Sequence, residues 1–173
     1  MKIKMKLSQS SIDDAIKQIE RFKSQLNTKT QTFVSKLADK GLNVANVRFA
    51  NAQYAGTNDV TCRVDADGSK ATIIASGSAV AFIEFGTGVS HSEYGGTLPA
   101  GVGKHGTYGK GYGKRKKWGY YGDPGNAGTV IGESDKGTLV STSGNEPAMA
   151  MWGAVEEMAA QVEATWREVW SDG

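Results

Sequence analysis

The side chains best able to act as nucleophiles, bases or metal ligands are few and widely separated in this sequence. Cys62 is the only cysteine, and the two histidines, His91 and His105, lie in a glycine-rich stretch. A catalytic nucleophile needs a base within hydrogen-bonding reach, and this distribution predicts no such pair. The set His91, Glu93 and His105 also lacks the ligand spacing of zinc sites. We therefore expect no catalytic residue, no metal and no cofactor, and expect that the chain is not an enzyme.

One carboxylate, that of Glu84, stands out because it lies near the end of an apolar run. It is followed by Phe85-Gly86-Thr87-Gly88. A buried carboxylate is costly unless it accepts hydrogen bonds, and glycine permits the positive φ with which a following loop could curl back. We expect backbone N–H groups of this loop, or Thr87, to bond Glu84. The five residues Glu84 to Gly88 are thus predicted to form a structural latch, or alternatively to carry Glu84 into a subunit interface.

The strongest local charge is a basic run that ends at a tryptophan: Lys114, Arg115, Lys116, Lys117 and Trp118. Tyrosines lie on both sides of it, and no acidic residue occurs between Glu93 and Asp123. Basic and aromatic side chains together can meet a phosphate backbone and stack on bases. These five residues are candidates for contact with DNA or with a partner. The alternatives are a solvated, flexible tip and docking on an acidic protein surface.

A long amphipathic helix is predicted to begin at Ser10 or Ser11. Apolar residues recur on one side from Ile12 to Leu37, with the three- and four-residue spacing of a helix. The polar run 27–32 has weak helix propensity and predicts a bend. Gly41 is predicted to end this helix, and a shorter helical piece should follow over about 42–52.

Four strands are predicted to make an antiparallel sheet. Residues 2–7 alternate lysine with apolar residues, which predicts a half-buried strand, the alternative being a disordered basic start. Residues 60–64, 71–75 and 79–85 predict a three-stranded meander, with Asp67-Gly68 in its first turn. The fold class is therefore α+β, with a sheet of about four strands packed by an N-terminal and a C-terminal helix.

Residues 86–144 contain most of the glycines and few aliphatic residues. A stretch of this length without structure is unusual in a compact domain. We expect either a functional arm or a small hairpin with strands over 129–131 and 138–140. Its low apolar content predicts that a neighbour orders it. The chain is then one domain, 1–173, with 86–144 as a basic, glycine-rich insertion.

The C-terminal helix has the clearest pattern. Asn145 is predicted to cap it, with Pro147 in its first turn. Its apolar residues repeat every seven positions: Ala148, Trp152, Val155, Ala159, Val162, Trp166 and Val169. This heptad stripe could pack on the sheet or form a coiled-coil contact with another subunit. Three apolar residues off the stripe are candidates for a subunit contact: Met151, Met158 and Trp170.

Size and composition restrict the class of protein. The chain has 173 residues, a formal net charge of +2 and 23 glycines. Its length suits one domain with a proper core. No stretch is apolar enough for a membrane span, and the basic N-terminus lacks the apolar block of a signal peptide. We expect a protein made in the cytoplasm, or in the cytoplasm of a host, without a membrane partner.

The run Ala75-Ser76-Gly77-Ser78-Ala79-Val80-Ala81-Phe82-Ile83-Glu84-Phe85-Gly86-Thr87-Gly88 resembles the signature of siphophage and prophage tail-completion proteins, also called head-to-tail joining or minor tail proteins. The expected order of elements is similar, and residues 52–60 resemble the segment that leads into the meander. The resemblance covers about 8–88 and 145–170. It departs from the family in the arm, which is longer and more basic.

This resemblance implies a structural protein of the virion, in the neck or tail, made in the host cytoplasm. Such proteins form rings, often of six copies, between the neck or connector proteins and the tail tube. The ring completes the tube, joins it to the head and surrounds the channel through which DNA passes. The alternative function is a nucleic-acid-binding module that uses the basic aromatic arm.

Overall fold

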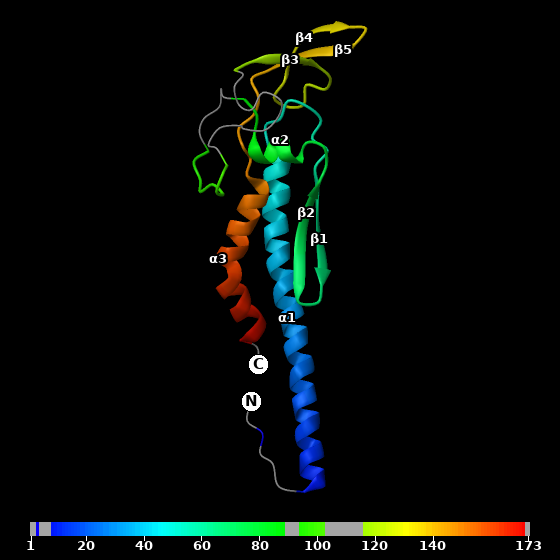
Figure 1. Ribbon diagram of the computed structural model, residues 1–173, viewed down its shortest axis with the longest axis vertical. Coiled ribbons are helices and arrows are strands. Elements are labelled where there is room, and N and C mark those ends of the chain that lie inside the picture. Colours follow the sequence, from blue (N-terminus) through cyan, green and yellow to red (C-terminus); the bar gives the residue numbers. More distant parts are fainter. Residues whose placement is uncertain (1–2, 4–7, 89–93, 103–115, 172–173) are drawn as a thin grey trace.

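The structure is a computed structural model that describes residue 3 and residues 8–88, 94–102 and 116–171. The elements in chain order are α1 (Gln9–Asn51), β1 (Thr61–Asp67), β2 (Lys70–Ser76), α2 (Val80–Phe85), β3 (Trp118–Tyr121), β4 (Thr129–Ser134), β5 (Gly137–Thr142) and α3 (Ala150–Trp170). The fold is α+β: α1 and α3 pack together, a two-stranded hairpin lies against α1, and a separate three-stranded antiparallel sheet lies near the end of the helical pair (Figure 1). The predicted N-terminal strand, 2–7, lies outside the described residues apart from Ile3.

Helix α1 runs without interruption for 43 residues and forms the long axis of the molecule (Figure 1). Ser8 is its N-cap, accepting a hydrogen bond from the Ser11 N–H, so the predicted start is two or three residues late. Three threonines in the polar run, Thr28, Thr30 and Thr32, donate to carbonyls four residues earlier. These bonds occupy the hydroxyls locally, and the helix continues through a region that propensity alone marked as weak.

The predicted end of this helix at Gly41 is wrong, and so is the separate piece that should follow it. Gly41 is buried inside α1, where a Cβ atom would meet Ile73 and Met158, both at 2.8 Å. The glycine is needed because the hairpin and α3 approach the axis of α1 closely. A C-cap glycine and a glycine at a close helix contact look alike in a sequence.

Strands β1 and β2 pair antiparallel over their whole length, from Thr61 opposite Ser76 to Asp67 opposite Lys70. This confirms the first two strands of the predicted meander and the turn between them. The hairpin lies along α1 (Figure 1), and Ile73 packs against the core of the molecule.

The predicted third strand, 79–85, is wrong because this segment is the six-residue helix α2. Asp59 explains the difference: its carboxylate accepts from the Ser78 N–H at 2.7 Å, the Ser78 hydroxyl at 2.8 Å and the Ala79 N–H at 2.9 Å. The carboxylate therefore satisfies N–H groups at the start of α2 in the manner of a capping residue. A short apolar run fits a strand or a helix equally well, and a cap from 19 residues away leaves no local signal.

The other sheet has the strand order β3-β5-β4, with both pairs antiparallel and a bulge between Val130 and Gly132. The predicted hairpin over 129–131 and 138–140 is confirmed, and both strands are longer than expected. Strand β3 was missed, although the alternation in Trp118-Gly119-Tyr120-Tyr121 and the β-propensity of its aromatic residues would have allowed it. The predicted single sheet of about four strands is replaced by two separate sheets.

Two polar residues connect this sheet to the segment after α1. Asn126 accepts from the Tyr54 N–H at 2.7 Å and donates to the Ala52 carbonyl at 2.9 Å. Asp123 accepts from the Thr57 hydroxyl at 2.8 Å. The described part of the predicted arm therefore has ordering contacts within its own chain, in contrast to the expectation that a neighbour would supply them.

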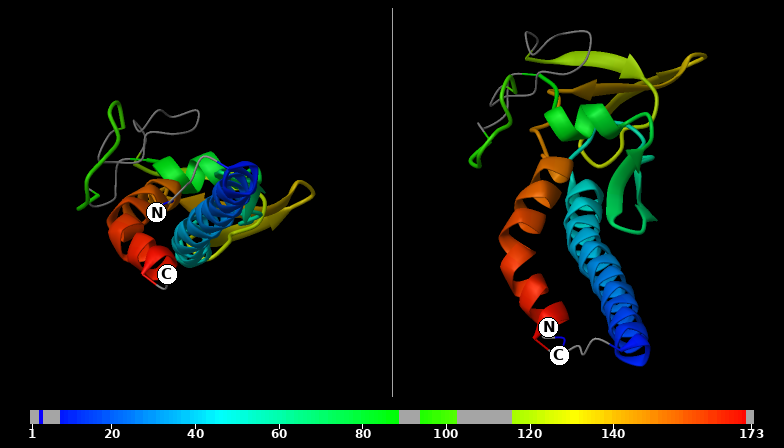
Figure 2. Two further views of the ribbon diagram at one scale, coloured as in Figure 1. Left: turned by 90° about the horizontal axis from the view of Figure 1, so that it is seen from below. Right: turned by 60° about the horizontal axis from the view of Figure 1, so that its bottom comes forward.

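Helix α3 lies alongside the C-terminal half of α1 in both views (Figures 1 and 2), running in the opposite direction. Its start is at Ala150 with Met149 at the N-cap, so the predictions for Asn145 and Pro147 are wrong, whereas the helix itself is confirmed. Its buried residues include Ala154, Thr165 and Val169. Packing of the heptad stripe on the sheet is also wrong: Val155, Val162 and Trp166 are exposed.

The core lies where α1, α2 and α3 meet. It consists of five alanines around two larger side chains: Ala45, Ala52, Ala79, Ala150 and Ala154, with Phe49 and Ile83. Alanines on α1 and α3 allow the two helices to pack closely, and Ile83 of α2 is fully buried at their junction. In the described ranges, no helix combines the length and the hydropathy that crossing a bilayer requires.

Candidate functional site

The residues of the predicted latch lie at the joint between α2 and α3. Glu84, in the last turn of α2, is 5% exposed. Its two carboxylate oxygens accept hydrogen bonds from the Met151 N–H at 2.9 Å and the Trp152 N–H at 3.1 Å. These are second and third residues of α3, whose N–H groups lack partners inside the helix. Glu84 therefore caps α3 from another helix, and its negative charge is favourable at a helix N-terminus.

Main-chain hydrogen bonds also connect α2 to the segment just before α3. The Ala148 N–H donates to the Ile83 carbonyl at 2.9 Å, and the Met149 N–H donates to the Glu84 carbonyl at 3.1 Å. Met149 is fully buried with φ of 47°, a left-handed conformation that costs free energy for a residue other than glycine. Arg48 of α1 donates to the Met149 carbonyl at 2.9 Å. The strained residue is therefore fixed from both α1 and α2.

Thr87 and Asn145 form the second half of the joint. Each donates its backbone N–H to the carbonyl of the other, at 2.8 and 3.0 Å, and the Thr87 hydroxyl donates to the Asn145 amide oxygen at 2.7 Å. The Asn145 amide nitrogen donates to the Phe82 carbonyl at 3.0 Å. Both side chains are buried, so the bonds compensate for their desolvation.

Glycines allow the two segments of this pair to approach. Gly86 has φ of 66°, and a Cβ there would lie 2.6 Å from the Pro147 nitrogen. Gly144 has φ of 87°, and a Cβ there would lie 2.0 Å from the Thr87 carbonyl oxygen. Both the backbone angle and the space exclude a side chain at these positions.

The prediction that the loop after Glu84 would donate to its carboxylate is therefore wrong. The carboxylate accepts from the Met151 and Trp152 N–H groups of α3, and Thr87 bonds Asn145 instead. The contribution of residues 144–149 was not predicted, because Gly144-Asn145-Glu146-Pro147 is equally compatible with the start of a helix. A single sequence does not indicate that two polar segments more than 50 residues apart, such as those around Thr87 and Asn145, will pair. The glycines at 86 and 144 indicate only that each segment can adopt a positive φ.

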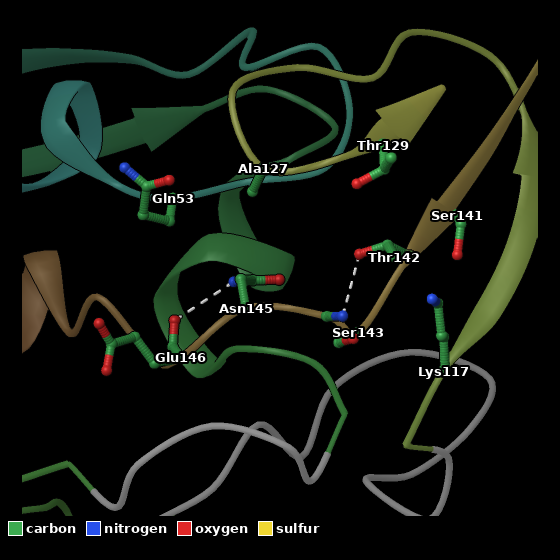
Figure 3. A pocket seen from close by; sticks show the side chains of 10 residues that line it. Gln53, Lys117, Ala127, Thr129, Ser141, Thr142, Ser143, Asn145 and Glu146 are labelled. Carbon is green, nitrogen blue, oxygen red and sulfur yellow. Dashed lines mark hydrogen bonds between the residues drawn. The ribbon is translucent and has the colours of Figure 1, made fainter. Parts of the chain in front are cut away.

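A polar pocket of about 370 Å³ lies between this joint and the three-stranded sheet (Figure 3). Most of its lining comes from the end of β5 and the segment that follows, together with Gln53, Ala127, Thr129 and Lys117. The Thr142 hydroxyl is occupied by the Gly144 N–H at 2.9 Å, and the Asn145 amide by main-chain carbonyls. Hydroxyls, amides, the Lys117 ammonium group and the Glu146 carboxylate line the pocket, and these groups can bind a polar ligand.

The basic aromatic run is described only from Lys116, since Lys114 and Arg115 lie outside the described residues. Lys117 is exposed and lines the pocket. Trp118 begins β3, and its ring lies over Gly88, 3.2 Å from the position that a Cβ would take. Contact of this run with DNA or with a partner protein stays a prediction.

The three predicted subunit-contact residues are half-buried within their own chain. Met151 packs against the core, Met158 lies over Gly41, and the Trp170 ring meets Phe33 edge-on with centroids 5.4 Å apart. The large apolar side chains that α3 exposes are instead Val155, Val162 and Trp166.

Titratable groups are perturbed mainly where they hold the fold together. Hydrogen bonds from Ser78 and Ala79 lower the pKa of Asp59 to about 2. Hydrogen bonds from Gly125 and Thr57 lower the pKa of Asp123. Burial, followed by the charge of Glu84, raises the pKa of Cys62, which makes this thiol a poorer nucleophile at neutral pH. Each shift has a structural cause.

The candidate metal ligands His91, Glu93 and His105 lie outside the described residues. Among the residues that the structure places, no group of three histidine, cysteine, aspartate or glutamate side chains is arranged to hold a metal ion. Comparisons of the chain with protein-family models, with curated proteins and with solved structures find no match.

Proposed function

We propose that this chain is a structural subunit of a phage neck or tail, which completes the tail tube and joins it to the head as part of a ring. The observation that carries the proposal is the run 75–88, which resembles the tail-completion signature. Its Glu84, Gly86 and Thr87 have structural tasks in the joint with α3. A segment that determines the fold in this way is compatible with a signature shared by proteins that act through assembly.

Two exposed apolar surfaces give further support. The N-terminal half of α1 carries five large apolar side chains that are at least 36% exposed, and α3 carries three more. Exposed apolar groups in a continuous stripe are typical of surfaces that meet another protein. A ring subunit between neck and tail needs surfaces that become buried only when copies assemble, and these two surfaces suit that role. We further propose that the chain acts without catalysis, without a cofactor and without a membrane partner.

The test uses tails prepared from a phage that lacks this gene product. Purified protein is added to the tails and to tail-less heads, and bound protein is measured by sedimentation and located by electron microscopy. We expect one ring of density at the head-proximal end of each tail and recovery of head joining. A chain that binds neither tails nor necks at concentrations where the tails remain intact would overturn the proposal.

A further inference from the structure

We infer that the N-terminal half of α1 docks on the outward face of α3 in a second copy of this chain. The inference rests on the proposed function only for its biological setting; the contact itself is argued from the two helix surfaces. It makes the proposed ring specific, because it names the two surfaces that meet.

Helix α1 extends well beyond the end of α3 (Figure 1). Near the C-terminal end of α3 the Trp170 ring meets Phe33 of α1, and Lys36 is bonded to Glu168. Toward the N-terminus, residues 9–28 of α1 are almost all exposed, with Ala15 the buried exception. Twenty helical residues span about 30 Å. Most helical stability in proteins comes from packing of an amphipathic face, and residues 9–28 have little such packing among the described residues.

The exposed part of α1 continues the face with which α1 already binds α3. Ile12, Ile19, Leu26 and Phe33 follow one another at intervals of seven residues, and Lys40 comes next. Phe33 contacts Trp170, and Lys40 donates to Gln161, both on α3 of the same chain. The same side of the helix, toward the N-terminus, exposes Ile12, Ile16, Ile19, Phe22 and Leu26 by 36% to 53%. This α1 stripe has the pattern of a helix-packing surface without its helix.

Helix α3 has a second apolar face that its own chain leaves open. Val155, Val162 and Trp166 are between 44% and 52% exposed, and Ala159 between them is also exposed. Their spacing of four, three and four residues is that of a coiled-coil seam. The Trp166 ring stacks on Trp170 with centroids 6.0 Å apart, which holds it in a fixed orientation on the surface. This set is the α3 stripe.

The two stripes match in length, and charge disfavours one of the possible pairings. The α1 stripe runs over 15 residues and the α3 stripe over 12, so their end residues lie about 21 and 17 Å apart along a helix. Residues 12–26 of α1 hold three basic and three acidic residues, a net charge of zero. Helix α3 holds four glutamates and one arginine, a net charge of −3. The charges therefore oppose α3 against α3, whereas α1 meets α3 without net repulsion.

A contact between different surfaces on the two copies satisfies both stripes in every subunit. An α1–α1 pair would cover one stripe and leave the α3 stripe in water. Contacts of this head-to-tail kind repeat, and they close into a ring when the rotation between copies permits. The chain has one α1 stripe and one α3 stripe, so each copy can have two neighbours.

The experiment compares three double variants of the full-length chain. The α1 variant is Ile19→Glu with Phe22→Glu, and the α3 variant is Val162→Glu with Trp166→Glu. The control is Val130→Glu with Ile131→Glu on β4, because these two residues are 51% and 58% exposed. All six positions are at the surface, so circular dichroism should show folded proteins in each case.

The molar mass of each protein is measured by light scattering over a concentration series. We expect the wild type and the control to form the same oligomer. The α1 and α3 variants should each need at least a tenfold higher concentration to associate, because each substitution buries a charge in an apolar contact. In the wild type, hydrogen exchange in residues 9–28 should slow as the concentration rises.

Mixing the two defective variants tests the pairing directly. The α1 variant keeps its α3 stripe and the α3 variant keeps its α1 stripe, so an equimolar mixture should form a complex of two chains and no larger species. An α3 variant that still assembles like the wild type, or a mixture that stays monomeric, would overturn the inference. A wild-type chain that is monomeric at about millimolar concentration yet binds tails would also overturn it, while leaving the proposed function in place.

Discussion

The Glu84 carboxylate accepts a hydrogen bond of 2.9 Å from the Met151 N–H, which joins the last turn of α2 to the first turn of α3 across 67 positions of the sequence. A second bond, from the Trp152 N–H, completes the cap. The relationship gives a physical reason for a glutamate in an apolar run. It is the acceptor that α3 lacks at its own N-terminus, and it binds α3 about one turn before the α3 stripe begins at Val155.

Glu84→Ala should lower the free energy of unfolding by about 2 kcal/mol, because two buried N–H groups lose their acceptor. Glu84→Gln should cost about 1 kcal/mol, since one oxygen remains but the charge at the helix end is lost. Urea unfolding followed by circular dichroism measures both. Glu133→Gln on β4, where the side chain is exposed, is the matched control and should change stability by less than about 0.5 kcal/mol. Equal stability of Glu84→Gln, Glu84→Ala and the wild type would refute the capping role.

Gly144→Ala and Gly137→Ala distinguish the cost of a positive φ from the cost of a steric clash with the added Cβ. Both glycines have a positive φ, of 87° and 103°, but an added Cβ at Gly144 meets the Thr87 carbonyl at 2.0 Å, whereas none of the described atoms lies within 4 Å of a Cβ at Gly137. Gly137→Ala should therefore cost about 1 kcal/mol from backbone conformation alone. Gly144→Ala should cost at least about 3 kcal/mol, or prevent folding, because the Thr87–Asn145 pair must open. Thermal unfolding distinguishes the two, and similar losses for both variants would mean that the joint is not tightly packed.

The sequence pattern predicted the long helices and the hairpins better than it predicted how they meet. Periodicity identified α1, α3, β1 with β2, and β4 with β5, since each depends on side chains close together in the chain. It failed at α2, where the distant carboxylate of Asp59 selects helix over strand, and at Gly41, where the space between packed helices requires glycine. Both decisions depend on residues that only the folded chain brings together.

In the candidate site, too, the local feature was predictable and its distant partners were not. The unusual position of Glu84 was evident because a carboxylate between apolar residues must find donors. The donors that it finds could not be predicted, because Met151 and Trp152 are remote in sequence. In addition, Asn145 is a residue type that commonly caps a helix, so the sequence placed the start of α3 too early. The heptad stripe of α3 was also recognised correctly as a pattern. Its middle part, from Val155 to Trp166, faces solvent because the small residues Ala150 and Ala154 give α1 a closer contact on the adjacent face.

Acid should weaken the start of α2 through Asp59. Its pKa falls from the usual 3.8 to about 2 in the folded protein, chiefly because of hydrogen bonds from the Ser78 and Ala79 N–H groups. A folded-state pKa below the unfolded value contributes stability above about pH 4, and this contribution is lost as the pH falls toward 2. Asp59→Asn should therefore flatten the decline of the melting temperature between pH 4 and pH 2, and should be less stable than the wild type at pH 7. A decline that is as steep in Asp59→Asn as in the wild type would assign the acid sensitivity to other groups.

Two buried threonines should respond in opposite directions to the same substitution. Thr165, fully buried in the part of α3 that faces α1, has a hydroxyl with no hydrogen-bond partner among the described atoms. Thr165→Val keeps the shape and removes this cost, so it should raise the free energy of unfolding by about 1 kcal/mol.

Thr87→Val is the matched comparison, because its hydroxyl donates to Asn145 at 2.7 Å and is also buried. This variant should lower the free energy of unfolding by about 1 to 3 kcal/mol, since the Asn145 amide oxygen is left without its donor. Urea unfolding of both variants, with hydrogen exchange at the Thr87 and Asn145 amides, locates the effect. Stabilisation by Thr165→Val, together with faster exchange at Asn145 in Thr87→Val, would show that the Thr87–Asn145 hydrogen bond stabilises the fold and that the Thr165 hydroxyl does not. A loss of similar size in both variants would show that the Thr165 hydroxyl has a partner after all, and that the contact between α1 and α3 is polar at its centre.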